Sequence, residues 1–302
     1  MPTPTVDRAE IELSAARAGV EDALRAHCDS YLGVLPPSVG EAVRYSIMGE
    51  GKRLRPLLVL AAYHACGGDG DAYALAASVE IVHAYSLVHD DLPCMDNDIV
   101  RRGRPTTHRL FGPRVATVAG VAMVPMAARA AADAARSLDL PRASRKAIVR
   151  ELMRASGAGG MVGGQLLDLE GEDRSLSLAE LERVHTAKTG ALIAASVRIG
   201  GLAAGADARQ SLALERYGEA IGLAFQIADD VLDATSTTAA LGKTAGRDAA
   251  LGKSTYPALL GVEGAVSRAA RLAEEARAAL EACLLLTPEL ARLASFVVDR
   301  KS

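Results

Sequence analysis

Residues 81–98 read IVHAYSLVHDDLPCMDND, an apolar run that ends in a cluster of carboxylates. A second stretch, residues 221–233, reads IGLAFQIADDVLD and ends in the same way. Both runs have the length and composition of buried helices with acid groups at their C-terminal ends. Clustered carboxylates repel one another and are costly beside apolar helices unless a cation neutralises them. The two stretches therefore predict a helical protein that binds cations.

The overall composition also predicts an all-α protein. The chain has 302 residues, of which 50% are hydrophobic and only 3% aromatic, with no Trp. It is rich in the helix formers Ala and Leu, whereas sandwiches and barrels use more aromatic and β-branched residues. A chain that is half apolar is not disordered. We predict a large single-domain helical bundle over residues 1–302, with residues 1–7 or so disordered.

Apolar runs and their breaks give the expected helices. The first is predicted over residues 9–31, and the second over residues 38–48 after Pro36 and Pro37. Further apolar runs cover residues 54–66, 75–92, 113–137, 145–168, 178–203, 209–232, 254–262 and 265–298. No alternating strand pattern, internal repeat or dividing linker stands out. Short gaps between the runs are typical of a helix bundle.

Charge and cysteine content exclude several classes of protein. The net charge of −3 argues against a nucleic-acid-binding protein. The four Cys form no CxxC pair, so neither a disulfide framework nor a zinc site is predicted. The N-terminus lacks a secretory signal, and the apolar run from Val115 to Ala128 falls short of the roughly 20 residues of a membrane helix. We expect a cytoplasmic protein without a transmembrane segment.

The two acid clusters differ in their predicted geometry. Asp229 and Asp233 are four residues apart and share a helix face. Asp90 and Asp96 are six apart and would face different directions on a regular helix. Pro93 lies between them and removes a backbone donor, so we predict a local bulge that returns Asp96 toward Asp90. The alternative is that these acids are ordinary solvated loop residues. Two clusters that both follow apolar helical runs make this alternative less favoured. Oxygen donors of this kind suit Mg²⁺.

Basic residues gather in four other stretches. Lys52, Arg53 and Arg55 open one apolar run, and residues 101–104 (RRGR) follow the first acid cluster. Lys188 interrupts another apolar run, and Lys243 and Lys253 follow the second cluster. Such cations suit the oxygens of a phosphate-bearing substrate. The chain has neither a P-loop nor a GxGxxG fingerprint, which argues against an ATP or NAD enzyme.

Taken in order, these motifs resemble those of the trans (head-to-tail) isoprenyl diphosphate synthases, from about residue 40 to 260. The matching stretches are GKRLRP (51–56), HAYSLVHDDLPCMDND (83–98), RRGRPTTH (101–108), GGQLLDL (163–169), HTAKTG (185–190), FQIADDVLDAT (225–235), LGKTAGRD (241–248) and GKSTYP (252–257). The resemblance implies the isoprenoid synthase fold, an all-α bundle around a deep central cavity, and a homodimer. It also implies three Mg²⁺ ions that bridge the two aspartate motifs to an allylic diphosphate.

The resemblance also assigns roles to individual residues. The implied metal ligands are Asp90, Asp91, Asp96, Asp229 and Asp233, supported by Asp230. The implied contacts to the allylic diphosphate are Arg101, Lys188, Lys243 and Lys253. The implied isopentenyl diphosphate site comprises Gly51, Lys52, Arg55, His83 and Arg102. Thr189 and Gln226 are expected to face the carbocation that forms when the allylic carbon–oxygen bond ionises.

Further expectations concern the length of the prenyl product and two departures from the family pattern. Tyr85 and Ser86, five and four residues before Asp90, are placed so that they could floor the product tunnel, and an ordinary buried Tyr85 is the alternative. With the two extra residues in the first motif, this resembles a C15-type synthase; small residues deeper in the tunnel would permit C20. Val121 stands where the family usually has Asp, and we expect a change in a buried structural contact. Glu50, beside Lys52, is expected to weaken the isopentenyl site.

We expect a prenyltransferase that joins isopentenyl diphosphate to dimethylallyl or geranyl diphosphate by ionisation, condensation and elimination, with farnesyl diphosphate as product. A geranylgeranyl diphosphate synthase is the alternative. A class I terpene cyclase is more remote, because cyclases normally lack the second Asp-rich motif and GKRLRP. A non-catalytic partner subunit is also remote, since such proteins tend to lose one acid cluster and both are intact here.

Overall fold

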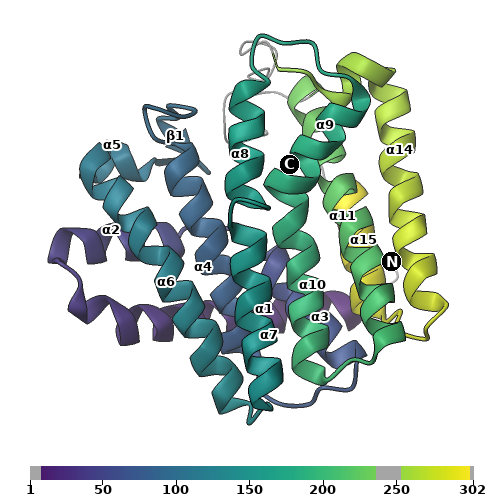
Figure 1. Cartoon of the computed structure of the whole chain (residues 1–302), viewed down its shortest axis with the longest axis horizontal. Helices are drawn as coiled ribbons and strands as arrows, with labels where there is room; N and C mark the ends of the chain where they lie inside the picture. The colour runs from purple at the N-terminus through teal and green to yellow at the C-terminus, as the bar shows by residue number, and fades with distance from the viewer. Residues whose placement is uncertain (1–7, 236–252, 300–302) are drawn as a thin grey trace, which may run out of the picture.

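The computed structural model describes residues 8–235 and 253–299, and almost all of its regular structure is helical (Figure 1). The first half comprises α1 (Arg8–Tyr31), the short helix η1 (Leu32–Val34), α2 (Pro37–Ile47), α3 (Leu54–Ala65), α4 (Tyr73–Asp90), β1 (Val100–Arg101), β2 (Arg104–Pro105), α5 (Thr107–Phe111) and α6 (Pro113–Ser137). The second half comprises α7 (Arg142–Ser156), α8 (Met161–Glu170), α9 (Leu178–His185), the π-helix η2 (Thr186–Gly190), α10 (Ala191–Ala204), α11 (Ala208–Thr235), α14 (Tyr256–Glu281) and α15 (Pro288–Asp299). The predicted all-α class is confirmed.

The predicted helices agree with the structure in the first half of the chain and need correction in the second. Residues 145–168 form two helices, because the glycine-containing segment 157–160 separates α7 from α8. The run 178–203 contains the π-helix η2 between α9 and α10. The predicted break near residue 262 agrees with a kink inside α14, where the backbone of Gly261 is non-helical with a φ of 72°. The predicted run 265–298 is wrong, because α14 ends at Glu281 and α15 begins at Pro288. Residues 1–7, predicted to be disordered, lie outside the described part of the chain.

Local sequence explains where several helices begin and end. α9 begins with a capping box in which Ser177 and Glu180 satisfy each other's backbone N–H groups. Thr255 caps the N-terminus of α14 by accepting a hydrogen bond from the Ala258 N–H. Gly205 ends α10 in the left-handed conformation that glycine adopts at little cost. These signals fix the helix ends on both sides of the segment that carries the second acid cluster.

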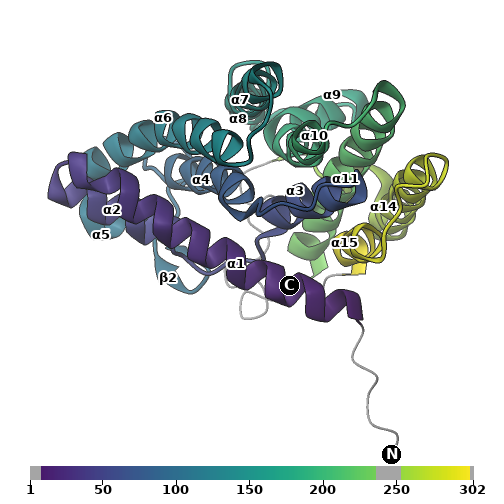
Figure 2. The same ribbon diagram turned by 90° about the horizontal axis from the view of Figure 1, so that it is seen from below.

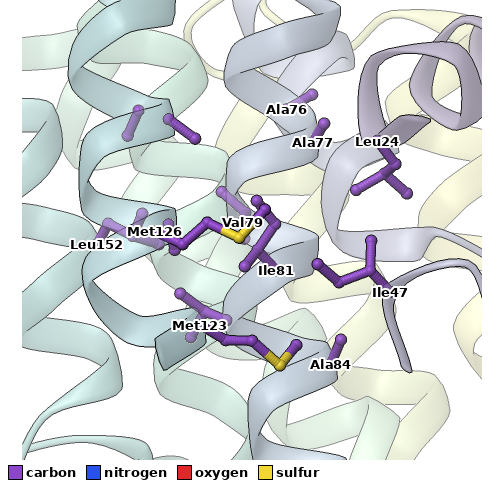
Figure 3. Close-up of a cluster of buried hydrophobic side chains, with 14 of the residues drawn as sticks. Leu24, Ile47, Ala76, Ala77, Val79, Ile81, Ala84, Met123, Met126 and Leu152 are labelled. Atoms are coloured by element: carbon purple, nitrogen blue, oxygen red, sulfur yellow. The ribbon is translucent and has the colours of Figure 1, made fainter. Parts of the chain in front are cut away.

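Two clusters of buried apolar side chains hold the bundle together. One joins α1, α2, α4, α6 and α7, and a part of it around Val79, Met123 and Leu152 is drawn in Figure 3. The other joins α9, α11, α14 and α15. Helices α3 and α10 contribute buried residues to both clusters. Seen from below, α3 lies near the middle of the molecule (Figure 2). The two clusters are therefore connected through α3 and α10.

Helix α6 departs from two expectations. By length and composition it is long and apolar enough to cross a membrane, although the core helix of a soluble protein passes the same test. It packs against α2, α4, α5 and α7, and 44% of its apolar window is buried. Val121 lies on its outer face with 60% exposure. The expectation that residue 121 makes a buried contact was therefore wrong.

Candidate active site

A cavity of about 800 Å³ lies between α3, α4, α8, η2, α11 and the segment before α14. Most of the residues singled out in the sequence line its wall. They are Gly51, Lys52, Arg55, His83, Ser86, Asp90, Asp96, Arg101, Arg102, Lys188, Thr189, Gln226, Asp229, Asp230, Asp233 and Lys253. Asp91 and Tyr85 are absent from the lining, and Lys243 lies outside the described residues. The structure thus brings together both acid clusters and the cations of four separate stretches.

The turn after α4 returns Asp96 to the cavity. The Asp96 N–H donates to the carbonyl of Asp90 at 2.9 Å, and the Asn97 N–H donates to the carbonyl of Leu92 at 3.0 Å. Asn97 has a φ of 52°, a left-handed conformation that Asn tolerates better than most residues. These contacts confirm the predicted bulge between Asp90 and Asp96.

Adjacent residues Asp90 and Asp91 have different surroundings. Burial raises the pKa of Asp90 to about 6; the Lys188 ammonium opposes this rise and the Asp96 carboxylate adds to it. Asp91 is 3% exposed, and its Oδ1 accepts a hydrogen bond from Arg101 Nε at 2.7 Å. Asp91 therefore orients Arg101, while Asp90 faces the cavity.

On α11, Asp230 holds the beginning of α14. Its Oδ2 accepts a hydrogen bond from the Tyr256 N–H at 3.0 Å and lies 3.3 Å from His185 Nε2. Its Oδ1 accepts one from Gln226 Nε2 at 3.2 Å, and Gln226 Oε1 accepts one from the Thr189 hydroxyl at 2.8 Å. Asp230 is 3% exposed. The network fixes the orientation of Gln226 and the position of the chain that follows Lys253.

Asp168 was not among the predicted site residues, although its motif GGQLLDL was recognised. Its Oδ2 accepts hydrogen bonds from Lys188 Nζ at 2.6 Å and from Lys253 Nζ at 2.8 Å. Burial alone would raise the pKa of Asp168, but Lys188 and then Lys253 outweigh it and hold that pKa below its usual range. One carboxylate on α8 therefore keeps two cations from distant segments at the cavity. The only signal in the sequence was that the motif has an acid among apolar residues.

Cations also line the cavity near the start of α3. Lys52 Nζ lies 5.4 Å from the centre of the Phe296 ring, and Arg55 Cζ lies 5.9 Å from that of Phe225. Burial lowers the pKa of His83 well below 6.5, and the nearby Arg55 and Arg102 lower it further, so this imidazole is neutral at pH 7. Phe296, on the last helix, had no distinguishing signal in the sequence. Glu50 lines the cavity too, and its backbone carbonyl accepts a hydrogen bond from Arg102.

The carboxylates fit magnesium shared with a substrate. Within residues 8–235 and 253–299, no three acid, His or Cys side chains lie close enough to enclose a metal ion by themselves. The cavity wall instead carries Asp90 and Asp96 at the end of α4, and Asp229 and Asp233 on α11. Mg²⁺ is commonly bound through one or two carboxylates together with substrate phosphates and water. The raised pKa of Asp90, to which Asp96 contributes, also indicates carboxylates that a divalent cation would stabilise.

Tyr85 does not floor this cavity. Its ring is half-buried, packs against the first apolar cluster and meets the His89 ring edge to face, with 4.9 Å between centroids. Ser86, the next residue, lines the wall, and its hydroxyl donates to the carbonyl of His83 at 2.9 Å. The Tyr85 ring thus lies behind the wall.

Comparison with known proteins identifies the family of the chain. The family model described as polyprenyl synthetase matches residues 36–283. The chain belongs to the polyprenyl synthetase family. It is 48% identical over 270 residues to farnesyl diphosphate synthase of Escherichia coli (strain K12), covering 87% of this chain and 89% of that protein. It is also 42% identical over 273 residues to geranylgeranyl pyrophosphate synthase 9, chloroplastic, of Arabidopsis thaliana, covering 88% and 75% of the two chains.

A solved member of similar structure is the geranyltransferase from Helicobacter pylori complexed with magnesium and isoprenyl diphosphate. The TM-score is 0.81 at 30% identity, with 98% of both chains covered. The all-α isoprenoid synthase fold predicted from the sequence is therefore confirmed, as is the assignment to a family of prenyl-transferring enzymes.

Proposed function

We propose that this chain condenses isopentenyl diphosphate with dimethylallyl or geranyl diphosphate, with farnesyl diphosphate (C15) as the main product. One observation carries the proposal: two carboxylate pairs and two separate groups of cations line a single cavity. Carboxylates that share magnesium with one diphosphate leave Lys52, Arg55 and Arg102 for a second, metal-free diphosphate. The 48% identity to a farnesyl diphosphate synthase supports this product class.

The residues of the cavity supply the electrostatics of an ionisation reaction. Asp90, Asp96, Asp229 and Asp233 would hold Mg²⁺, three ions by family resemblance, and bound Mg²⁺ stabilises negative charge on the leaving diphosphate. Lys188, Lys253 and Arg101 donate hydrogen bonds to the same leaving group as its charge grows. Thr189 and Gln226 present oxygen atoms toward the allylic cation. The buried wall excludes water that would otherwise quench the cation.

Geranylgeranyl diphosphate (C20) is the alternative product. It is supported by the 42% identity to a geranylgeranyl pyrophosphate synthase and by Tyr85, which is not among the residues that line the cavity. A terpene cyclase and a non-catalytic partner are less well supported, because both acid clusters and the Lys52–Arg55 cations line the cavity.

We also propose a cytoplasmic homodimer. The outer face of α6 carries Val118 and Val121, which are 52% and 60% exposed, and Leu110 of the neighbouring α5 is 54% exposed. Residues three apart on a helix lie on the same face, so these valines form one apolar surface. An exposed apolar surface is typical of a protein–protein contact. A second copy of the chain is the occupant that family resemblance favours.

Product analysis tests the catalytic proposal. Purified protein with Mg²⁺ and isopentenyl diphosphate should be offered dimethylallyl, geranyl and farnesyl diphosphates separately. We expect diphosphate release with the first two and a C15 product by chromatography. Efficient elongation of farnesyl diphosphate would favour the C20 alternative, and no turnover with any primer would refute the proposed function.

A further inference from the structure

Arg53 differs from its neighbours Lys52 and Arg55, because its charge is used entirely within the protein. Its side chain is only 2% exposed. Nε donates to Glu21 Oε1 of α1 at 2.6 Å, and NH1 donates to Glu80 Oε1 of α4 at 2.9 Å. The guanidinium is therefore engaged by two carboxylates and is not directed at a diphosphate.

The same guanidinium also fixes the segment that leads into α3. Arg53 NH2 donates to the carbonyls of Gly49 at 2.7 Å and Ile47 at 3.3 Å. Ile47 is the last residue of α2, and Gly49 belongs to the connection between α2 and α3, on which Gly51 and Lys52 line the cavity. One buried side chain therefore joins α1, α4 and this connection.

The backbone of Arg53 is strained. It immediately precedes α3 with φ 52° and ψ 33°, a left-handed conformation that is unfavourable for a residue with a Cβ. Such conformations persist where surrounding contacts determine them, and they cluster at functional sites. The reversal at Arg53 lies between Lys52 and Arg55, and all three residues border the cavity. The Arg53 side chain differs because it is only 2% exposed and is bonded to Glu21 and Glu80.

We infer that Arg53 is a positioning residue for the isopentenyl diphosphate subsite. Its bonds to Glu21, Glu80 and the Gly49 carbonyl hold the connection so that Lys52 and Arg55 are already placed before the substrate binds. Preorganisation of this kind improves affinity because less ordering is needed on binding. The inference rests on the proposed function, since it concerns one of the two substrates of that reaction.

Steady-state kinetics of Arg53→Lys provides the test. Lysine keeps the positive charge but loses the planar fork that spans two carboxylates and two carbonyls. We expect KM for isopentenyl diphosphate to rise about tenfold, the effect of losing roughly one charged hydrogen bond, with KM for the allylic diphosphate within about twofold. Calorimetric titration of the metal-free variant with isopentenyl diphosphate should show the same loss.

Two further variants separate positioning from general damage. Arg198→Lys is the control: Arg198 also links two carboxylates, Glu151 and Glu215, but is not among the cavity-lining residues, so we expect both KM values unchanged. If Arg53→Lys folds poorly, Arg53→Met with Glu80→Gln removes the two most buried charges of the cluster and leaves only Glu21, whose side chain is 26% exposed to solvent. That double variant should also show the selective rise in KM.

The outcomes separate the two hypotheses. A wild-type enzyme without turnover would refute the proposed function, and this inference with it. An active wild type whose Arg53 variants change both KM values equally, or neither, would refute the inference alone.

Discussion

At the scale of single residues, the buried carboxylate of Asp90 lowers the stability of the metal-free protein when it is ionised. Its pKa is raised from 3.8 to about 6, chiefly by burial. Between these two pH values the folded protein retains a proton that the unfolded chain has lost. The contribution of Asp90 therefore makes the metal-free protein less stable as pH rises from about 4 to 6.

Asp90→Asn should remove this loss of stability and should also abolish the proposed prenyl transfer. We expect the metal-free variant to be more stable at pH 7 by at most about 3 kcal/mol, and prenyl transfer to be lost. Thermal unfolding in the presence of a chelator between pH 4.5 and 7.5 measures the effect. The exposed Asp69→Asn is the control, and equal pH profiles for Asp90→Asn and wild type would contradict the assignment.

Tyr85 lies behind the cavity wall, whereas its neighbour Ser86 lines the cavity. Tyr85→Ala removes a half-buried ring that packs against the first apolar cluster outside the cavity lining, and the tunnel can extend into the space that it leaves. We expect the main product to shift from C15 toward C20, measured by chromatography after dephosphorylation. Tyr31→Ala is the matched control, because Tyr31 packs on the same cluster but lies outside the cavity lining. Unchanged product length in Tyr85→Ala would contradict the role.

At the scale of elements, the π-helix η2 lets two consecutive side chains face the cavity. Lys188 and Thr189 both line it, although neighbouring residues on a regular α-helix diverge by about 100°. π-helical turns within helices are frequent at functional sites. Helix α8 approaches η2 so closely that a Cβ at position 164 would lie 2.1 Å from the Lys188 nitrogen.

Gly164→Ala should therefore disturb the site through backbone displacement. We expect a loss of stability of about 1–3 kcal/mol, typical of overpacking, and a fall in kcat as Lys188 moves away from Asp168. Chemical denaturation and steady-state kinetics measure the two effects. In the control Gly159→Ala the added Cβ has no atom within 4 Å, so wild-type values are expected there. Wild-type kcat in Gly164→Ala would refute this coupling.

At the scale of the whole molecule, the outer face of α6 makes a prediction about assembly. The double substitution Val118→Glu and Val121→Glu places charge on the proposed contact, and we expect a dimer to become a monomer by light scattering coupled to size exclusion. Val262→Glu with Val266→Glu, on the exposed side of α14, is the control that should leave the mass unchanged. A monomeric wild type would contradict the proposed assembly.

Much of the fold was predictable because helix formation is local. Apolar spacing, Pro37 and Pro113 near helix starts, and the capping box at Ser177 are all visible in the sequence. The clearest error fell where local signals are ambiguous: the glycines at 157–160 interrupt the predicted run 145–168, whereas the glycines of α8 continue a helix. Whether a glycine breaks a helix depends on what packs beside it, which a local pattern does not contain.

The sequence by itself determined the class of fold and the chemistry of the site, because helical periodicity and the clustering of acids and cations are local properties. Only the tertiary structure decided which role each charged side chain has. It turns Asp90 toward the cavity and Asp91 toward Arg101, bonds Asp168 to two lysines from distant segments, and buries Arg53 between Lys52 and Arg55. The physical reason is that the free energy of a charge depends on burial and on its partners in space, and those partners come from elements far apart in the chain.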